Sequence, residues 1–276
     1  MRVLIVGNCQ VVPIAACLRE LLPSILFDAI WLGSDSVDAI ETARTNLGSY
    51  DEVFCHSTAL SSFGGVHRMV PLPAINFTGF HPDDIVVQDI YGAIGRHHSA
   101  IGVCGFLLGF SPARSQRLFN RFIYASLGYF DEFNVAKERF LSQSERMGFD
   151  LRKAFEDWPM PFMHDPVHPK FEPIAALAKL IALRLGQTVE TDLSAARESF
   201  EKQPTVSYPV YPEVAANLGL TQVPPRFRYP HTSSGFSLIE YLRKSFECYE
   251  TVNRVVLEQV VSFELPILSG MCTRQR

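Results

Sequence analysis

The strongest constraint on the fold is an alternation of strand-like and helical runs over the first 90 residues. Val3 to Val6 is a short apolar run rich in β-branched residues, and apolar side chains recur at helical spacing over residues 11–22. Further strand-like runs lie at 25–32, 52–56 and 75–80, with a helical run at 36–47. Such alternation is typical of a parallel sheet wrapped by helices. The sequence therefore predicts a small N-terminal parallel sheet of three to five strands.

Helical periodicity replaces the strand pattern beyond residue 91. Helices are predicted at 100–108, 113–127, 135–147, 174–185, 193–200 and 236–263, with a proline-rich loop before the last of them. The predicted class is α/β with a majority of helix, in which a sheet of SGNH or flavodoxin-like character is embedded in a large helical body. A chain of 276 residues with 47% hydrophobic residues can bury a sizeable core. We expect a single domain, 1–276, with an α/β portion at 1–90 and a mainly helical portion at 91–276.

Charge and cysteine usage exclude several classes of protein. Lys and Arg number 25 against 29 Asp and Glu, so the chain lacks the basic field that binds nucleic acid. No apolar run reaches the roughly 20 residues of a transmembrane helix, and no signal-peptide core is present, so we expect a cytoplasmic protein without a transmembrane segment. The six cysteines form no CxxC pair, which predicts free thiols and no metal site. The oligomeric state leaves no trace in the sequence.

The most specific local signal is Gly7-Asn8-Cys9-Gln10, where the first predicted strand meets the first predicted helix. A thiol near a helix N-terminus feels the positive end of the helix dipole, which lowers its pKa and favours the reactive thiolate. The backbone N–H groups there, with the Asn8 side chain, are suited to bind the oxyanion of an acyl-transfer intermediate. The alternative is that Cys9 is one of six thiols that pack as small apolar side chains.

Three stretches of this chain resemble a known family. They are Gly7-Asn8-Cys9-Gln10, Phe80-His81-Pro82-Asp83 and His168-Pro169, spread over roughly the first two thirds of the sequence. They are similar to the capsular polysaccharide biosynthesis family typified by WcbI. The resemblance implies transfer of an acetyl group from acetyl-coenzyme A to a sugar of the polysaccharide, with a cysteine in a catalytic triad.

Two histidines are candidates for the base beside Cys9. Asp165-x-x-His168 has the spacing used in SGNH-type hydrolases, where the acid orients the histidine, and it follows an early nucleophile as in those enzymes. His81 is the competitor, because it follows the predicted strand 75–80 and precedes Asp83. Both segments also fit ordinary turns and caps. The predicted catalytic residues are therefore Cys9, His168, Asp165 and His81.

Coenzyme A or acetyl-coenzyme A, implied by the resemblance, needs polar and cationic contacts. The loop that begins at Ser57 is rich in hydroxyls and glycine, so its backbone can approach a ligand closely; the alternative is a solvated surface loop. Arg68 follows this loop, and Arg114, Arg117 and Arg121 share one predicted helix face that offers further cations for phosphates. The predicted cofactor-binding residues are Gly7, Asn8, Gln10, Ser57, Arg68 and Asp83.

The leading hypothesis is a coenzyme A-dependent O-acetyltransferase that acts on a carbohydrate acceptor in capsular or exopolysaccharide biosynthesis. One alternative is an SGNH-like thiol esterase that acts on acylated carbohydrate, with the same catalytic residues. Another is a non-catalytic component of a polysaccharide assembly system, in which Cys9 is structural. Binding of coenzyme A and the reactivity of the Cys9 thiol distinguish the three.

Overall fold

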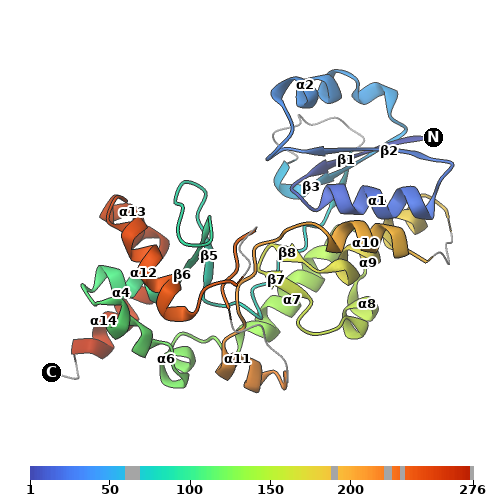
Figure 1. Ribbon diagram of the computed structural model, residues 1–276. Helices are drawn as coiled ribbons and strands as arrows, with labels where there is room; N and C mark the ends of the chain where they lie inside the picture. Colours follow the sequence, from blue (N-terminus) through green and yellow to red (C-terminus); the bar gives the residue numbers. More distant parts are fainter. Residues whose placement is uncertain (60–68, 188–191, 221–225, 231–233, 274–276) are drawn as a thin grey trace. The chain divides into compact units, whose positions relative to one another are not determined.

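The computed structural model describes residues 1–59, 69–187, 192–220, 226–230 and 234–273 (Figure 1). The chain folds into two compact units. Unit 1 consists of Met1–Asn76, Glu138–Phe162 and His168–Gln203, and unit 2 consists of Phe77–Lys137, Met163–Val167 and Pro204–Arg276. The chain passes between the units several times, so their division does not follow the predicted boundary at residue 90. That all 276 residues form one domain stays a prediction.

Unit 1 contains a four-stranded parallel sheet in the order β2-β1-β3-β4. The strands are β1 (Arg2–Gly7), β2 (Leu26–Trp31), β3 (Glu52–His56) and β4 (Met69–Leu72). The first three lie where the hydrophobic runs predict them, because each run is short, apolar and rich in β-branched or aromatic side chains. This sheet confirms the predicted α/β class with an N-terminal parallel sheet.

Helices cover both faces of this sheet (Figure 1). Leu4 and Val6 belong to a buried cluster with Ala43 of α2 (Val37–Thr45). Figure 1 shows α1 (Val11–Leu21) on the opposite side of the sheet, where it packs against α9 (Phe171–Arg184) and α10 (Ser194–Glu201). Because neighbouring side chains of a strand point to opposite faces, β1 is buried on both sides. The remaining elements of the unit are η1 (Leu47–Ser49), η2 (Ser57–Ala59), α8 (Arg152–Asp157) and β8 (His168–Pro169).

The predicted fourth strand at Ile75–Phe80 is wrong. The fourth strand is β4, a short edge strand that contains Pro71, a residue tolerated at sheet edges. The backbone of Ile75 is hydrogen-bonded instead by the side chain of Gln10, which accepts from the Ile75 N–H at 2.9 Å and donates to its carbonyl at 3.0 Å. A side-chain amide thus takes the place of a neighbouring strand for this residue.

Unit 2 is built around an antiparallel pair of strands and several short helices. The pair is β5 (Asp84–Val86) with β6 (His97–Ser99), and β6 leads directly into α4 (Ala100–Leu107). Ser99 caps α4 by accepting a hydrogen bond from the Gly102 N–H at 2.8 Å. The other elements are β7 (Met163–Asp165), α5 (Pro112–Ser115), η3 (Gln116–Leu118), α6 (Arg121–Ser126), α11 (Pro212–Asn217), α12 (Leu238–Tyr249), α13 (Arg254–Val260) and α14 (Glu264–Thr273). Helix α7 (Glu132–Arg146) has residues in both units.

Two long predicted helices are interrupted by asparagine caps. The predicted helix 113–127 is divided where Asn120 accepts hydrogen bonds from the Phe122 and Ile123 N–H groups and starts α6. The predicted helix 236–263 is divided where Asn253 accepts from the Val255 N–H and starts α13. Helices account for 49% of the chain. Among the described residues no single helix is long and apolar enough to cross a membrane. Helix α13 and Glu264–Cys272 together have the length and apolar composition of a span, but they are bent by 99°.

Candidate active site

Cys9 lies in the turn between β1 and α1, two residues before the helix begins. The turn is closed by hydrogen bonds from the Val11 N–H to the Asn8 carbonyl at 3.2 Å and from the Gln10 N–H to Asn8 Oδ1 at 3.0 Å. All six cysteines are free, as predicted. Cys9 is partly exposed, whereas burial raises the pKa of Cys17 to about 12 and that of Cys55 to about 11. Cys9 is therefore accessible at the sheet edge where ligands bind in open α/β folds.

His56, a residue that the sequence analysis did not single out, fixes this turn. It ends β3, the strand beside β1, and its buried Nδ1 accepts a hydrogen bond from the Asn8 N–H at 3.3 Å. Burial lowers the pKa of His56 to about 4, so the ring is neutral near pH 7. Because Nδ1 is the acceptor, the proton is on Nε2, which has no hydrogen-bond partner among the described residues. The available sequence signal was only that His56 ends the predicted strand at 52–56.

Gly7 is required by the close approach of the His56 ring. A Cβ at Gly7 would lie 2.3 Å from His56 Nδ1. We expect Gly7→Ala to displace the ring and lower the free energy of unfolding by about 1–3 kcal/mol. Gly48→Ala is the matched control in the same unit, because a Cβ there meets nothing within 4 Å. Urea denaturation of both variants tests this, and equal stabilities would contradict it.

The buried His56 ring also predicts a dependence of stability on pH. Its pKa is lowered from 6.5 to about 4 in the folded state, so between these values the unfolded chain binds more protons than the folded chain. The contribution of His56 to stability is therefore lost as the pH falls from about 6.5 to about 4. We expect the wild type to lose up to about 3 kcal/mol relative to His56→Gln over this range. Urea denaturation at several pH values measures the difference, and a constant difference would contradict the prediction.

The other predicted residues of the turn have distinct roles. Gln10 is buried and holds the Ile75 backbone, so its contribution is structural rather than the predicted cofactor contact. Asn8 uses its Oδ1 as the acceptor for the Gln10 N–H, which directs its Nδ2 group away from this bond. The Asn8 N–H is taken by His56, so it is not the oxyanion donor that the sequence suggested. The Cys9 N–H and the Asn8 Nδ2 group form no hydrogen bond with a described residue.

Ser57 directly follows His56 at the end of β3 and is partly exposed in η2. Its hydroxyl is thus at the same carboxyl-terminal end of the sheet as the turn that holds Cys9. Arg68, the predicted cation of this loop, lies outside the described residues. The roles of both residues in cofactor binding stay predictions.

Asp83 is the centre of a buried hydrogen-bond network in unit 2. Its carboxylate accepts from the Ile101 N–H and from four hydroxyl groups, those of Ser99, Tyr129, Tyr208 and Tyr211. Burial raises the pKa of Asp83 above its ordinary value. Asp83 follows His81 closely in the sequence but does not orient its ring, because both carboxylate oxygens accept hydrogen bonds from these donors. Because both oxygens of Asp83 already accept hydrogen bonds within the protein, they also argue against the predicted contact of Asp83 with a cofactor.

His81 is fully buried, and burial lowers its pKa to about 4. The Asp165 carboxylate and the Met163 and Pro209 carbonyl groups raise the pKa of His81, but burial lowers it by more. Those carbonyl groups lie outside hydrogen-bond geometry, and neither ring nitrogen has a hydrogen-bond partner among the described residues. The ring is therefore neutral near pH 7, and its low pKa makes it a weak general base.

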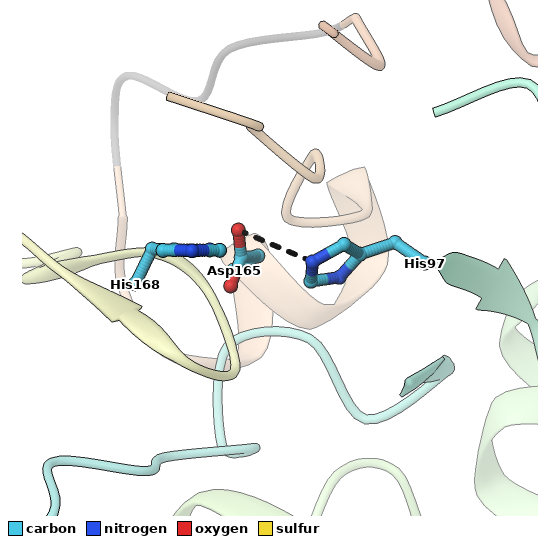
Figure 2. Close-up of side chains that lie close together, drawn as sticks. All are labelled: His97, Asp165 and His168. Carbon is cyan, nitrogen blue, oxygen red and sulfur yellow. Dashed lines mark ion pairs between the residues drawn. The ribbon is translucent and has the colours of Figure 1, made fainter. Parts of the chain in front are cut away.

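Asp165 faces His97, another residue to which the sequence analysis gave no catalytic role (Figure 2). His97 Nδ1 is 2.8 Å from Asp84 Oδ2, and Nε2 is 3.8 Å from Asp165 Oδ2; all three side chains are buried. Burial raises the pKa of Asp84 to about 7. The other Asp165 oxygen accepts from the Val167 N–H at 2.9 Å. An imidazole between two carboxylates is suited to hold or transfer a proton, and its nitrogen and the Asp165 oxygen are atoms that also bind divalent metals.

His168 follows Asp165 by three residues and starts β8 of unit 1, and it is also labelled in Figure 2. The contact of Asp165 with His97 could not be predicted from the sequence, because the two residues are far apart along the chain. The contact of His97 with Asp84 likewise depends on the pairing of β5 with β6. The predicted catalytic roles of Cys9, His168 and Asp165 stay predictions.

These features define an α/β protein with an accessible thiol at the carboxyl-terminal edge of a parallel sheet. The family described as polysaccharide biosynthesis enzyme WcbI matches residues 47–190, more than half of the chain. The chain therefore belongs to the WcbI family of polysaccharide biosynthesis enzymes. The matched range contains His56, His81, His97, Asp165 and His168.

A solved structure of WcbI has the same fold. It is described as a novel polysaccharide biosynthesis enzyme, in native form without a disulfide bond between coenzyme A and one of its cysteines. The similarity covers 96% of this chain and 98% of that chain, with a TM-score of 0.70 and 12% sequence identity. At this identity the likeness shows the fold alone. No curated protein matches the sequence.

Proposed function

We propose that this chain transfers an acetyl group from acetyl-coenzyme A to a sugar hydroxyl during capsular or exopolysaccharide biosynthesis, as a cytoplasmic enzyme. The observation that carries the proposal is the partly exposed Cys9 thiol in the turn between β1 and α1. Membership of a polysaccharide biosynthesis family supports a carbohydrate acceptor. The similar WcbI structure, whose description names coenzyme A and a cysteine without a disulfide bond between them, supports the acyl donor.

The turn at Cys9 fits a thioester substrate. Acetyl-coenzyme A supplies an acetyl group activated as a thioester. Cys9 N–H and the Asn8 Nδ2 group are donors that could stabilise negative charge on the acyl oxygen. His56 and Gln10 position the turn: His56 accepts from the Asn8 N–H, and the Gln10 side chain bonds to the Ile75 backbone.

The transfer needs a general base. The same base serves whether the acetyl group passes through Cys9 or goes directly to the sugar hydroxyl. If Cys9 is acylated, the base takes the thiol proton and passes it to the departing coenzyme A thiolate; it then takes the proton of the sugar hydroxyl as that oxygen attacks the acetyl-cysteine, and returns it to the Cys9 thiolate. In the direct route the base activates the hydroxyl for attack on the thioester of acetyl-coenzyme A and passes its proton to the leaving coenzyme A thiolate. We assign this base to His168 rather than His81, because the pKa of His81 is lowered to about 4. Asp165 is proposed to orient His168, and His97 to position Asp165 through the contact at 3.8 Å.

Acetyl transfer can be measured directly with labelled acetyl-coenzyme A and de-acetylated polysaccharide fractions. The proposal predicts label in the carbohydrate and release of one coenzyme A for each acetyl group. Release of acetate from acetylated carbohydrate without coenzyme A would identify the thiol esterase instead. If neither reaction occurs and Cys9 reacts with iodoacetamide no faster than the other partly exposed cysteines, Cys248 and Cys272, the chain is a non-catalytic component.

A further inference from the structure

Unit 2 contains a cavity that the proposed reaction does not use. Its volume is about 360 Å³, within the range of small-molecule sites. Its walls come from the segment after α4, from α5 and η3, from the start of α6 and from the end of α14. The residues that matter for its chemistry are two cations, Arg114 and Arg117, and the apolar side chains of Phe110, Phe122, Ile123 and Met271.

Two arginines give the described lining of the cavity a positive charge. Neither Arg114 nor Arg117 forms an ion pair with a described residue, and the described lining includes no carboxylate. The Arg114 guanidinium carbon lies 3.8 Å from the centroid of the Phe110 ring, so the aromatic wall holds this cation in place. Arg152 and Arg197, by contrast, are paired with glutamates.

The apolar part of the lining is partly open to solvent. Phe122 is 66% exposed, although it lies beside the buried Ile123. A ligand that covered this ring would remove apolar surface from water and would be favoured for that reason. The cavity therefore offers both cationic and apolar contacts to one ligand.

We propose that this cavity binds a phosphate ester that carries an apolar group. Guanidinium groups donate in a fork that matches phosphate oxygens, and two of them match the charge of a phosphate monoester. The apolar part of the ligand packs against Phe110, Phe122 and Met271. This inference does not depend on the proposed acetyl transfer, because none of these residues belongs to the turn at Cys9 or to the Asp165–His97 pair.

Calorimetric titration of the full chain with dodecyl phosphate tests the proposal. We expect one binding site, with inorganic phosphate and an uncharged dodecyl glucoside each binding at least about 10-fold more weakly. Arg114→Gln and Arg117→Gln should each weaken binding of dodecyl phosphate by about 10-fold. Arg121→Gln is the matched control, because its guanidinium stacks on Phe130 at 5.2 Å and does not line the cavity.

The source of the ester is distinguished by a second measurement. Sedimentation with phosphatidic acid vesicles that depends on Arg114 and Arg117 indicates a membrane lipid, and arginine-dependent binding of dodecyl phosphate without sedimentation indicates a soluble ester. Equal weakening by Arg121→Gln, or no binding of dodecyl phosphate, would overturn the proposal. Displacement by coenzyme A would also overturn it, because the cavity would then belong to the acyl donor.

Discussion

Replacing Cys9 with alanine is expected to lower acetyl transfer by at least about 1,000-fold if the thiol carries the acetyl group. The fold should be retained, because Cys9 is small and partly exposed and the turn is held by hydrogen bonds that do not use its side chain. The free energy of unfolding should change by less than about 0.5 kcal/mol. Initial rates with labelled acetyl-coenzyme A, together with urea denaturation, measure both effects.

Cys248→Ala is the control for this experiment, since Cys248 is also partly exposed but lies in α12 of unit 2. It should leave the rate unchanged. A loss of less than about 10-fold in Cys9→Ala would show that the thiol lines the site without being acylated, and the direct route would then apply.

Replacing Asp83 with alanine is expected to cause the largest loss of stability in unit 2. Five donors, from Ser99, Ile101, Tyr129, Tyr208 and Tyr211, would lose a shared buried acceptor. Removal of one partner from a buried charged network costs about 3–5 kcal/mol because the remaining polar groups stay desolvated. Urea denaturation followed by near-ultraviolet circular dichroism of the tyrosines measures the loss.

Asp89→Ala is the matched control for Asp83→Ala, because Asp89 lies in the same segment but is exposed. Its effect should stay within about 0.5 kcal/mol. If Asp83→Ala unfolds at the same urea concentration as Asp89→Ala, the network does not hold unit 2 together.

The local features of the fold were predictable from the sequence. The three strands β1, β2 and β3 coincide with short apolar runs, and α1 begins at Val11 where helical spacing begins. The position of Cys9 before α1 followed from the same pattern. Whether a short segment forms a helix or a strand depends largely on residues close together in the sequence, and the spacing of apolar residues indicates which of the two it forms.

Contacts between distant residues were not predictable in this way. Gln10 bonds to Ile75 across 65 positions, at the start of the run predicted as a fourth strand, while Tyr208 reaches Asp83 across 125 positions. The role of His56 depends on the register of β3 beside β1, and that of His97 on the pairing of β5 with β6. The sequence around a histidine or tyrosine does not indicate which distant backbone group or carboxylate its side chain will contact in the folded protein.

Calorimetric titration of the purified chain with coenzyme A and acetyl-coenzyme A tests the central claim most directly. The account predicts that both bind at one site with micromolar affinity, and that binding survives Cys9→Ala, because most contacts of so large a ligand lie away from the thiol. If neither binds more tightly than about 1 mM, which corresponds to only about 4 kcal/mol, the chain has no site for the acyl donor and the proposed acetyl transfer is wrong.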